Sequence, residues 1–486
     1  MLFGFPSGTM AAKGVPKRNF MNNNEACTTI IVGSKAMADG SMIYARSDDS
    51  TAVKATRLVY YPAGKGPSEF VALDSPFRCP LPPRRYAFSA LERADLPYHW
   101  GEAGFNDRGV GMSATETIFS NAKVLALDPY VESGLAENSV YQIVLPYVKT
   151  AREGVLRLAE LIEKYGSAEG FGIAFMDGKE TWYLENAGGH RYLAKKMPSD
   201  KYYVSGNQSR YREYDPKEDI ASADLVQWAR ENGLFEGEFD FHEAYSLESE
   251  NDKTYNYPRV WYLQEMFTPS VKTDVKVNNW PVYQTPDRLL TVEDIKKAFR
   301  SHYDGTSHDP YLHSNPKEPY RPISIFRTIN THILQVREGL PMEIGRLDYM
   351  AEGMADLCVF LPLYQGVTSY PKAYGIGTKH SQKTSAYWLF RKVSCLGMLN
   401  YNKYAPIIKG AYGDLEGAMS KSQVKMEAEF LSLCKDGKAT PEAVALIQKW
   451  SDKWLTKALK VASDLEEKLF TELTKDIEVE YKFHGA

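Results

Sequence analysis

Two short segments near the start of the chain are rich in β-branched and aromatic residues, a pattern typical of strands. They are residues 28–33, Thr-Thr-Ile-Ile-Val-Gly, and residues 41–46, Ser-Met-Ile-Tyr-Ala-Arg. Between them, Asp39-Gly40 is a strong two-residue hairpin turn, because both positions tolerate a positive φ. The pattern therefore predicts an antiparallel hairpin that brings Arg46 back beside the start of the first strand.

Helical periodicity follows further along the chain. The run Thr150-Ala151-Arg152-Glu153 is the signature of a capping box, and Gly166 is a suitable C-terminal stop. Between them, apolar residues recur at helical spacing: Val155, Leu158, Leu161, Ile162 and Tyr165. A second helical stretch is expected around Ser139–Tyr147.

The middle of the chain reads mainly as strands and turns. Residues 62–100 are rich in Pro and Gly and predict loops, and residues 104–114 predict a turn that leads into a strand. Successive antiparallel strands are then expected at Phe171–Met176, Thr181–Glu185, Arg191–Ala194 and Tyr202–Ser205. Clusters of hairpins with helices between them favour an α+β layered domain over a βαβ dinucleotide fold, and no GxGxxG or P-loop motif contradicts this.

From about residue 411 the pattern becomes helical. Thr440 is a good N-cap with Pro441 at the first helical position. An apolar stripe follows among lysines and glutamates, formed by Val444, Ile447, Leu455, Leu459, Leu465 and Leu469. We expect an amphipathic helix that packs on the main domain or on a partner subunit, in a homo-oligomer.

Composition narrows the class of protein. The 486 residues carry 58 basic and 62 acidic side chains, so a net charge of −4 offers no global field for nucleic acid or an anionic membrane. No apolar run approaches the roughly 18 residues that a spanning helix needs. The five cysteines are scattered and form no CxxC pair, and the histidines do not cluster at metal-ligand spacing. We therefore expect neither a metal nor another cofactor.

The first 26 residues contain Lys13, Lys17 and Arg18 but no apolar segment of the length that a secretory signal requires. The expected location is therefore cytoplasmic. Two interpretations of this leader stay open: a tail without a role, or a propeptide that caps the residue after it, Cys27.

Cys27 stands at the head of its strand, behind the small residue Ala26. A buried strand cysteine is usually inert, but removal of the leader would make Cys27 an N-terminus. Its α-amino group, with a pKa of about 7.7–8.0, could then act as the base for its own thiol. Arg46 would stabilise the thiolate, and Asp49, in the turn after the second strand, would orient the ammonium. His190 is a weaker alternative base, since it follows a Gly-Gly turn.

These residues also carry a family resemblance. The segments 26–33, 38–41 and 45–49 resemble the start of the cysteine dipeptidases of the N-terminal-nucleophile (Ntn) hydrolase superfamily. Later blocks of the chain resemble that family too: Gly104–Thr117, Glu185–His190, Gly206–Ser209 and Tyr320–Ser324. The resemblance covers roughly residues 26–415. Ser47 departs from it, because the family pattern leads us to expect Asn there.

The resemblance implies a four-layer αββα Ntn-hydrolase sandwich, self-removal of the leader and hydrolysis of dipeptides with broad side-chain tolerance. The domains would be a leader at 1–26, a catalytic domain at 27–410 and a helical C-terminal extension at 411–486. Carried over by position, Cys27 matches the nucleophile and Arg46 and Asp49 the pair beside it. Asn207 matches an oxyanion-hole donor, a role typically worth about 3 kcal/mol.

Two further residues are candidates for substrate binding. Glu116 falls near a position where acylase relatives carry an amide, and its charge could favour the free amino group of a dipeptide. Arg259 is a candidate for polarising the site. Each of these side chains also has a structural interpretation: Glu116 as a solvated strand end, Asn207 as a turn residue and Arg46 as an ion-pair partner.

Two function classes stay open at this point. The first is a cysteine dipeptidase that acts on dipeptide substrates, and within this enzyme class an acylase that acts on other linear amides is the alternative. The second is a non-hydrolytic, secernin-like scaffold protein that keeps the fold, since folds are reused for unrelated functions.

Overall fold

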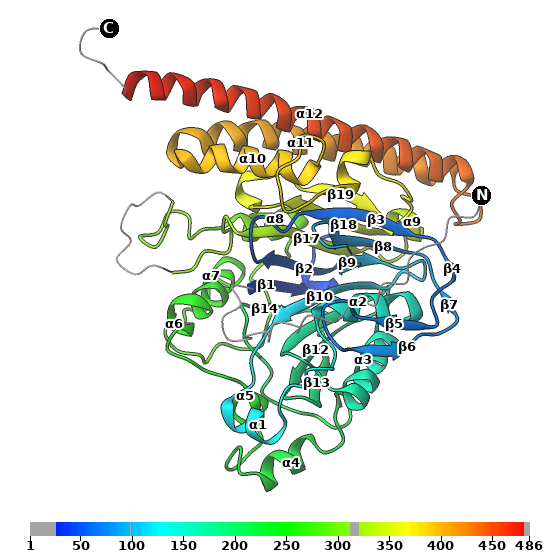
Figure 1. Cartoon of the computed structure of the whole chain (residues 1–486), viewed down its shortest axis with the longest axis vertical. Helices are drawn as coiled ribbons and strands as arrows, with labels where there is room; N and C mark the ends of the chain where they lie inside the picture. Colours follow the sequence, from blue (N-terminus) through cyan, green and yellow to red (C-terminus); the bar gives the residue numbers. More distant parts are fainter. Residues whose placement is uncertain (1–25, 98, 312–319, 481–486) are drawn as a thin grey trace, which may run out of the picture.

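The computed structural model describes residues 26–97, 99–311 and 320–480 (Figure 1). The predicted leader therefore lies outside the described residues, except for Ala26. Within the described ranges, the strands form two large antiparallel sheets and two small hairpins.

The first sheet contains the two strands predicted at the start of the chain. Its strand order, within the described residues, is β16-β14-β1-β2-β17-β18-β19. The bounds are β16 Tyr283–Gln284, β14 Tyr202–Ser205, β1 Ala26–Val32, β2 Met42–Asp49, β17 Thr328–Val336, β18 Arg346–Glu352 and β19 Leu361–Tyr364. The predicted hairpin is confirmed, because β1 and β2 pair antiparallel and Gly40 in their connection has a φ of 71°.

The second sheet has the order β15-β13-β12-β11-β10-β9-β8-β3 among the described residues. The bounds are β15 Ile220–Ala221, β13 Arg191–Lys196, β12 Thr181–Ala187, β11 Phe171–Met176, β10 Gly111–Thr117, β9 Gly101–Phe105, β8 Phe88–Arg93 and β3 Thr56–Tyr61. Two sequence predictions need correction here. The strand at 202–205 does not continue the meander, because β14 crosses to the first sheet and pairs with β1. Residues 62–100 are not only loops, because β8 belongs to the second sheet and short strands precede it.

Those short strands pair as two hairpins: β4 (Gly64–Lys65) with β7 (Arg84–Arg85), and β5 (Glu69–Val71) with β6 (Arg78–Pro80). Their apolar side chains are sparse and their strands are two or three residues long. Pro and Gly between such short pieces hide the alternation from which strands are predicted.

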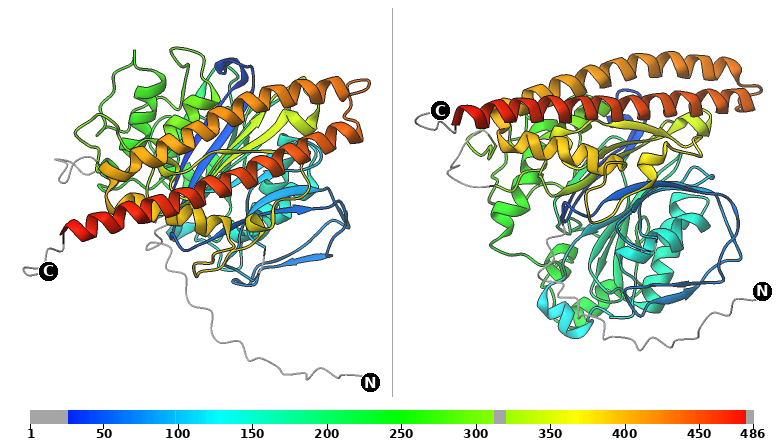
Figure 2. Two further views of the ribbon diagram at one scale, coloured as in Figure 1. Left: turned by 90° about the horizontal axis from the view of Figure 1, so that it is seen from above. Right: turned by 45° about the horizontal axis from the view of Figure 1, so that its top comes forward.

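Helices cover the outer face of each sheet (Figures 1 and 2). On the second sheet lie α2 (Glu137–Val144) and α3 (Ala151–Tyr165), whose apolar side chains share a core with it. On the first sheet lie α7 (Tyr257–Phe267), α8 (Val292–Arg300), α10 (Ala386–Leu399), α11 (Tyr401–Leu433) and α12 (Pro441–Glu480). The described residues thus form the four layers of an αββα sandwich, and the predicted fold class is confirmed.

Smaller helices occupy the connections. They are α1 (Ala122–Leu127), α4 (Leu225–Glu231), α5 (Phe241–Tyr245), α6 (Asp252–Tyr255) and α9 (Met342–Gly345). Four 3₁₀ turns in the described residues are η2 (Ser34–Ala36), η3 (Leu145–Tyr147), η4 (Ala355–Leu357) and η5 (Lys372–Gly375).

The helices confirm the local signals in the sequence. The Thr150 side chain accepts a hydrogen bond from Glu153 N at 3.1 Å, and α3 ends at Gly166 with a φ of 74°. At the C-terminal end, helical structure begins earlier than predicted, at Ala386 instead of about 411. Since α11 runs through residue 410, the predicted domain boundary there stays a prediction and lies inside a helix.

The two faces of β1 look into different cores, and this fixes the surroundings of Cys27. Ile30 belongs to the core between the first sheet and its helices, whereas Ile31 belongs to the core between the two sheets. Successive side chains of a strand alternate between its faces. Cys27 therefore shares the inter-sheet side with Ile31, and Thr28 shares the helix-facing side with Ile30.

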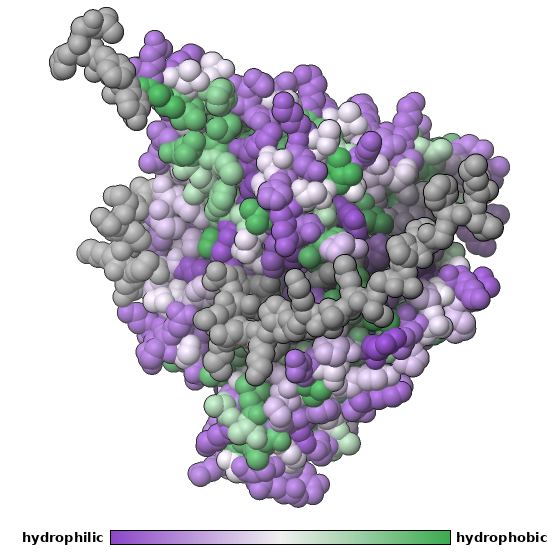
Figure 3. All heavy atoms as spheres, viewed as in Figure 1, coloured by the Kyte–Doolittle hydropathy of each residue, from purple (hydrophilic) through white to green (hydrophobic). Residues whose placement is uncertain are grey.

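The surface in the view of Figure 3 is mainly hydrophilic, with apolar side chains gathered towards the carboxyl end of α12. Phe470, Ile477 and Val479 of that helix are exposed. Among the described residues, no helix combines the length and the apolar character needed to cross a membrane.

Candidate active site

Cys27 is the second residue of β1 and lies opposite Asp48 of β2. Only 3% of it is exposed, and its Sγ accepts a hydrogen bond from Nη1 of Arg46 at 3.0 Å. Burial raises the pKa of the Cys27 thiol well above its ordinary value, and the Arg46 charge opposes that rise. The predicted pairing of Cys27 with Arg46 is therefore present.

Arg46 is fully buried and has a separate acceptor for each end of its guanidinium. Its Nε donates to Ser113 Oγ at 3.0 Å and its Nη2 to the Ala114 carbonyl at 2.9 Å. Burial works against this charge, but Cys27 and Asp48 outweigh it, so the pKa of Arg46 lies above its ordinary value. The guanidinium therefore stays positive and fixed in direction at the thiol.

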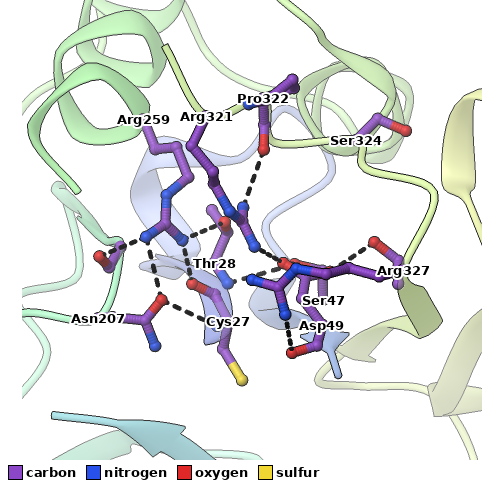
Figure 4. Close-up of polar contacts among 12 residues, drawn as sticks. Cys27, Thr28, Ser47, Asp49, Asn207, Arg259, Arg321, Pro322, Ser324 and Arg327 are labelled. Atoms are coloured by element: carbon purple, nitrogen blue, oxygen red, sulfur yellow. Dashed lines mark hydrogen bonds and ion pairs between the residues drawn. The ribbon is translucent and has the colours of Figure 1, made fainter. Parts of the chain in front are cut away.

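Asn207 follows the end of β14, directly beside β1. Its φ of 68° is left-handed, a conformation that asparagine tolerates better than most residues. Its Oδ1 accepts a hydrogen bond from the Cys27 backbone N at 3.0 Å (Figure 4). Its Nδ2 donates to the Thr117 carbonyl at 2.9 Å. The strained turn thus holds the amide group at the Cys27 backbone.

Glu116, on β10, is buried beneath Asn207. Its Oε1 accepts from Asn207 N at 2.7 Å, and its Oε2 accepts from the Tyr183 hydroxyl at 2.9 Å. Burial raises the pKa of Glu116, and the hydrogen bond from Asn207 N opposes the rise. These contacts make Glu116 a support for the left-handed turn; its predicted contact with a substrate amino group stays a prediction.

Arg259, on α7, joins the Cys27 segment to Asn207. Its Nη1 donates to the Cys27 carbonyl and to Thr28 Oγ1, and its Nη2 donates to Gly206 O at 2.7 Å and Asn207 Oδ1 at 3.0 Å (Figure 4). Burial, reinforced by the nearby charge of Arg321, lowers the pKa of Arg259 to about 10. Its donors are used to hold backbone and side-chain acceptors, in the fork geometry peculiar to arginine.

Asp49 is the last residue of β2, not part of the turn after it, and lies opposite Ala26. Its carboxylate accepts from Ser47 Oγ at 3.3 Å and pairs with Arg321 (Figure 4). It also accepts from the Thr328 hydroxyl. Ser47 Oγ also accepts from the Thr28 backbone N at 3.2 Å. Ser47 therefore links Asp49 to β1, at the position where an Asn was expected.

Two groups of residues were missed by the sequence reasoning. The first is Arg321, in the segment Tyr320–Ser324 that resembles the family. The sequence did not indicate that Arg321 is buried and pairs with Asp49, although a buried arginine needs a carboxylate partner. His332 was missed because β17 was not predicted, although the run 328–336 is rich in β-branched residues. Ser113 lies on β10, where a strand was predicted, but its contact with His332 could not be seen from the sequence. The alternative base His190 contacts Asp128 at 2.8 Å through its Nδ1.

The model of peptidase family C69 matches residues 26–412, a range that contains the six site residues described above. The chain belongs to peptidase family C69. This C69 member is accordingly a cysteine peptidase, and the family resemblance seen in the sequence is confirmed.

Two relatives of this C69 peptidase carry dipeptidase names. It is 46% identical over 385 residues to the probable dipeptidase of Salmonella dublin, covering 75% of this chain and 89% of the relative. It is 36% identical over 395 residues to the probable dipeptidase B of Lactococcus lactis subsp. lactis, covering 79% and 83%. A mutant conjugated bile acid hydrolase from Clostridium perfringens matches in structure with a TM-score of 0.31 and 12% identity, covering 70% of this chain and 92% of its own.

Proposed function

We propose that this C69 peptidase is a dipeptidase of broad side-chain tolerance. Cys27, freed by self-cleavage of the Ala26–Cys27 bond, is its nucleophile and the α-amino group of Cys27 is its base. One observation carries the proposal: the N, O and Sγ atoms of Cys27 each contact a different predicted site residue. They are Asn207, Arg259 and Arg46. The dipeptidase names of the relatives support the substrate class.

Self-cleavage begins when Cys27 Sγ attacks the carbonyl carbon of Ala26. The thioester that forms releases the Cys27 nitrogen as a free amine, and water then hydrolyses the thioester and leaves the thiol. Before this step the nitrogen is an amide and cannot accept a proton; after it, the nitrogen can.

In the mature enzyme, the α-amino group takes the proton of the thiol, and Sγ attacks the carbonyl of the dipeptide. One hydrogen of Asn207 Nδ2 is bound to Thr117 O, which leaves the second for the oxyanion. The α-ammonium protonates the leaving amine, and water hydrolyses the thioester. Asn207 Oδ1, which accepts from the Cys27 nitrogen, orients the base throughout.

Intact-mass measurement of the purified chain is expected to give a product that begins at Cys27, and Cys27→Ala is expected to abolish both cleavage and hydrolysis. Cys395→Ala is the matched control, because Cys395 is an exposed cysteine on α10. A stable full-length product with dipeptidase activity would contradict the mechanism.

The substrate class is tested with a panel of dipeptides set against N-acylated amines. A dipeptidase cleaves the dipeptides and leaves the acylated amines intact, and an acylase shows the reverse preference. If the leader is not cleaved and no compound is hydrolysed, the result supports the scaffold function instead. Within the panel, Glu116→Gln separates two roles: a higher KM for dipeptides fits contact with the substrate, and a lower kcat fits support of Asn207.

A further inference from the structure

A line of buried polar side chains leads away from Arg46 between the two sheets. We call it the inter-sheet network; its members are Arg46, Ser113, His332, Asn330 and Glu102. Arg46 Nε lies 3.0 Å from Ser113 Oγ, which lies 2.6 Å from His332 Nε2. His332 Nδ1 lies 2.9 Å from Asn330 Oδ1, and Asn330 Nδ2 lies 2.6 Å from Glu102 Oε2.

The strand register brings these residues together. On the face of the first sheet that looks towards the second, Arg46 lies opposite His332, and Asp48 lies opposite Asn330. Ser113 and Glu102 come from β10 and β9 of the second sheet. The network therefore crosses repeatedly between the sheets, and each of its five side chains is almost completely buried.

The hydrogen bonds of the network form one consistent series of donors and acceptors. Arginine can only donate, so Ser113 Oγ accepts from Arg46. Asn330 Nδ2 donates to Glu102, so Asn330 Oδ1 accepts from His332 Nδ1, and the neutral ring then offers Nε2 as the acceptor for the Ser113 proton. A serine hydroxyl bonded on both sides in this way holds the guanidinium at one angle.

The charges around the network agree with this direction. Burial, with the Arg46 charge, lowers the pKa of His332 well below its ordinary value, so the ring is neutral and can accept from Ser113. Burial and Asp48 raise the pKa of Glu102 well above its ordinary value. The charged groups that act on Cys27 are Arg46, Asp48 and Asp49 from β2 and Glu137 from α2.

We propose that Ser113 and His332 are positioning residues that hold the Arg46 guanidinium against Cys27 Sγ. The inference rests on the proposed function in one respect, that Cys27 is the nucleophile. Arg46 is the positive group that hydrogen-bonds to Sγ, so its angle decides how strongly it favours the thiolate. Without Ser113, Arg46 Nε and His332 Nε2 lose their shared partner in the buried space between the two sheets, and we expect the guanidinium to lose its fixed angle at the sulfur.

The experiment measures the thiol directly. In the mature enzyme, the rate of Cys27 alkylation by iodoacetamide is followed against pH by peptide mass spectrometry, together with kcat and KM. The variants are Ser113→Ala and His332→Leu, with Ser113→Thr and His332→Gln as variants that keep the hydroxyl and the acceptor. Ser394→Ala is the control, because it removes a buried hydroxyl on α10 that bonds to the main-chain carbonyls of Leu357 and Phe390.

For Ser113→Ala and His332→Leu we expect the alkylation midpoint to move to higher pH and kcat to fall roughly tenfold or more, with KM little changed. The Thr and Gln variants are expected to recover most of both, and Ser394→Ala to match the wild type. Folded Ala and Leu variants with the wild-type profile would overturn the proposal. It would also be overturned if Ser394→Ala moved the midpoint equally, or if the Thr and Gln variants stayed folded and recovered nothing.

The two proposals fail in different ways. If Cys27 is alkylated and activity persists, the proposed nucleophile is wrong, whatever the variants do. If alkylation stops activity but the alkylation midpoint is the same in all folded variants, the nucleophile stands and the positioning role is wrong.

Discussion

The two arginines at Cys27 act on opposite sides of one strand. Arg46 reaches Sγ from the inter-sheet side, and Arg259 reaches the Cys27 carbonyl from the helix-facing side. Successive side chains of a strand point to opposite faces, so a nucleophile at the start of a strand can be contacted from both faces at once. Neither arginine can take over the contacts of the other, because they belong to different layers.

Asp348 shows the cost of a buried carboxyl that, among the described residues, has no cationic partner within salt-bridge distance. It lies on β18 opposite Leu334 and is buried between the sheets. Burial raises the pKa of Asp348 from 3.8 to about 7, against a hydrogen bond from the Ile333 backbone. The folded chain therefore keeps this proton up to about pH 7, whereas the unfolded chain releases it near pH 4.

The buried Asp348 carboxyl makes the stability of the fold depend on pH. Because the folded state binds the proton of Asp348 more tightly than the unfolded state does, the contribution of Asp348 to the free energy of unfolding is greatest below pH 4. It falls as the pH rises to about 7. Asp348→Asn is expected to remove that fall, which amounts to about 1.4 kcal/mol for each unit by which the pKa is raised. Urea unfolding of both proteins from pH 4 to pH 8 checks it. Parallel curves across this interval would contradict the assigned pKa.

At the level of elements, β1 is held at its far end by a close approach of the backbone. Gly33, directly after β1, donates its N–H to Lys201 O at 2.9 Å. A Cβ on Gly33 would lie 2.4 Å from the Pro198 carbonyl oxygen and 2.5 Å from that of Ser199. The segment that leads into β14 therefore lies so close to the end of β1 that position 33 needs a glycine.

We predict that Gly33→Ala destabilises the chain by roughly 1–3 kcal/mol, the usual range for overpacking. It is also expected to slow self-cleavage, since it displaces β14 and with it Asn207 from Cys27. Gly375→Ala is the matched control, because nothing lies within 4 Å of its added Cβ among the described residues. Thermal unfolding and the ratio of full-length to mature mass measure the two effects; equal results for both variants would refute the prediction.

The elements that the sequence predicts well are those decided by neighbouring residues. The β1–β2 hairpin follows from Asp39-Gly40, and α3 follows from its cap at Thr150. The sheet to which β14 belongs could not be predicted, because a strand pattern does not name its partner. For the same reason the sequence predicts only part of the site. Cys27, Arg46 and Asn207 are predicted by motif, but the contact between Ser113 and His332 depends on how the two sheets pack against each other.

On the scale of the whole molecule, the C-terminal helices act as the outer layer of the first sheet. Ile447, Leu455 and Leu465 of α12 belong to the same core as Ile30 of β1. The apolar stripe expected from the sequence therefore packs on the main domain in this chain. The homo-oligomer stays a prediction, which light scattering of the mature protein will test.

Removing one of these contacts has a predictable cost. Ile447 is completely buried, so Ile447→Ala is expected to lower the free energy of unfolding by about 2–5 kcal/mol while kcat of the folded enzyme stays unchanged. Phe470→Ala, on an exposed part of the same helix, is the control and should change stability by less than about 0.5 kcal/mol. Urea titration measures both; a loss below about 1 kcal/mol for Ile447→Ala would mean that α12 does not depend on this contact.

The crossing of β14 between the sheets has a consequence in time. The bond from Cys27 N to Asn207 joins residues 180 positions apart, and that from Arg259 to the Cys27 carbonyl joins residues 232 apart. Contacts between such distant residues form late, because long loops must close before them. The proposed cleavage thus has to wait until most of the chain has been synthesised and folded. An incomplete or misfolded chain would therefore keep its leader. A free α-amino group at Cys27 would be present only in chains that have completed folding.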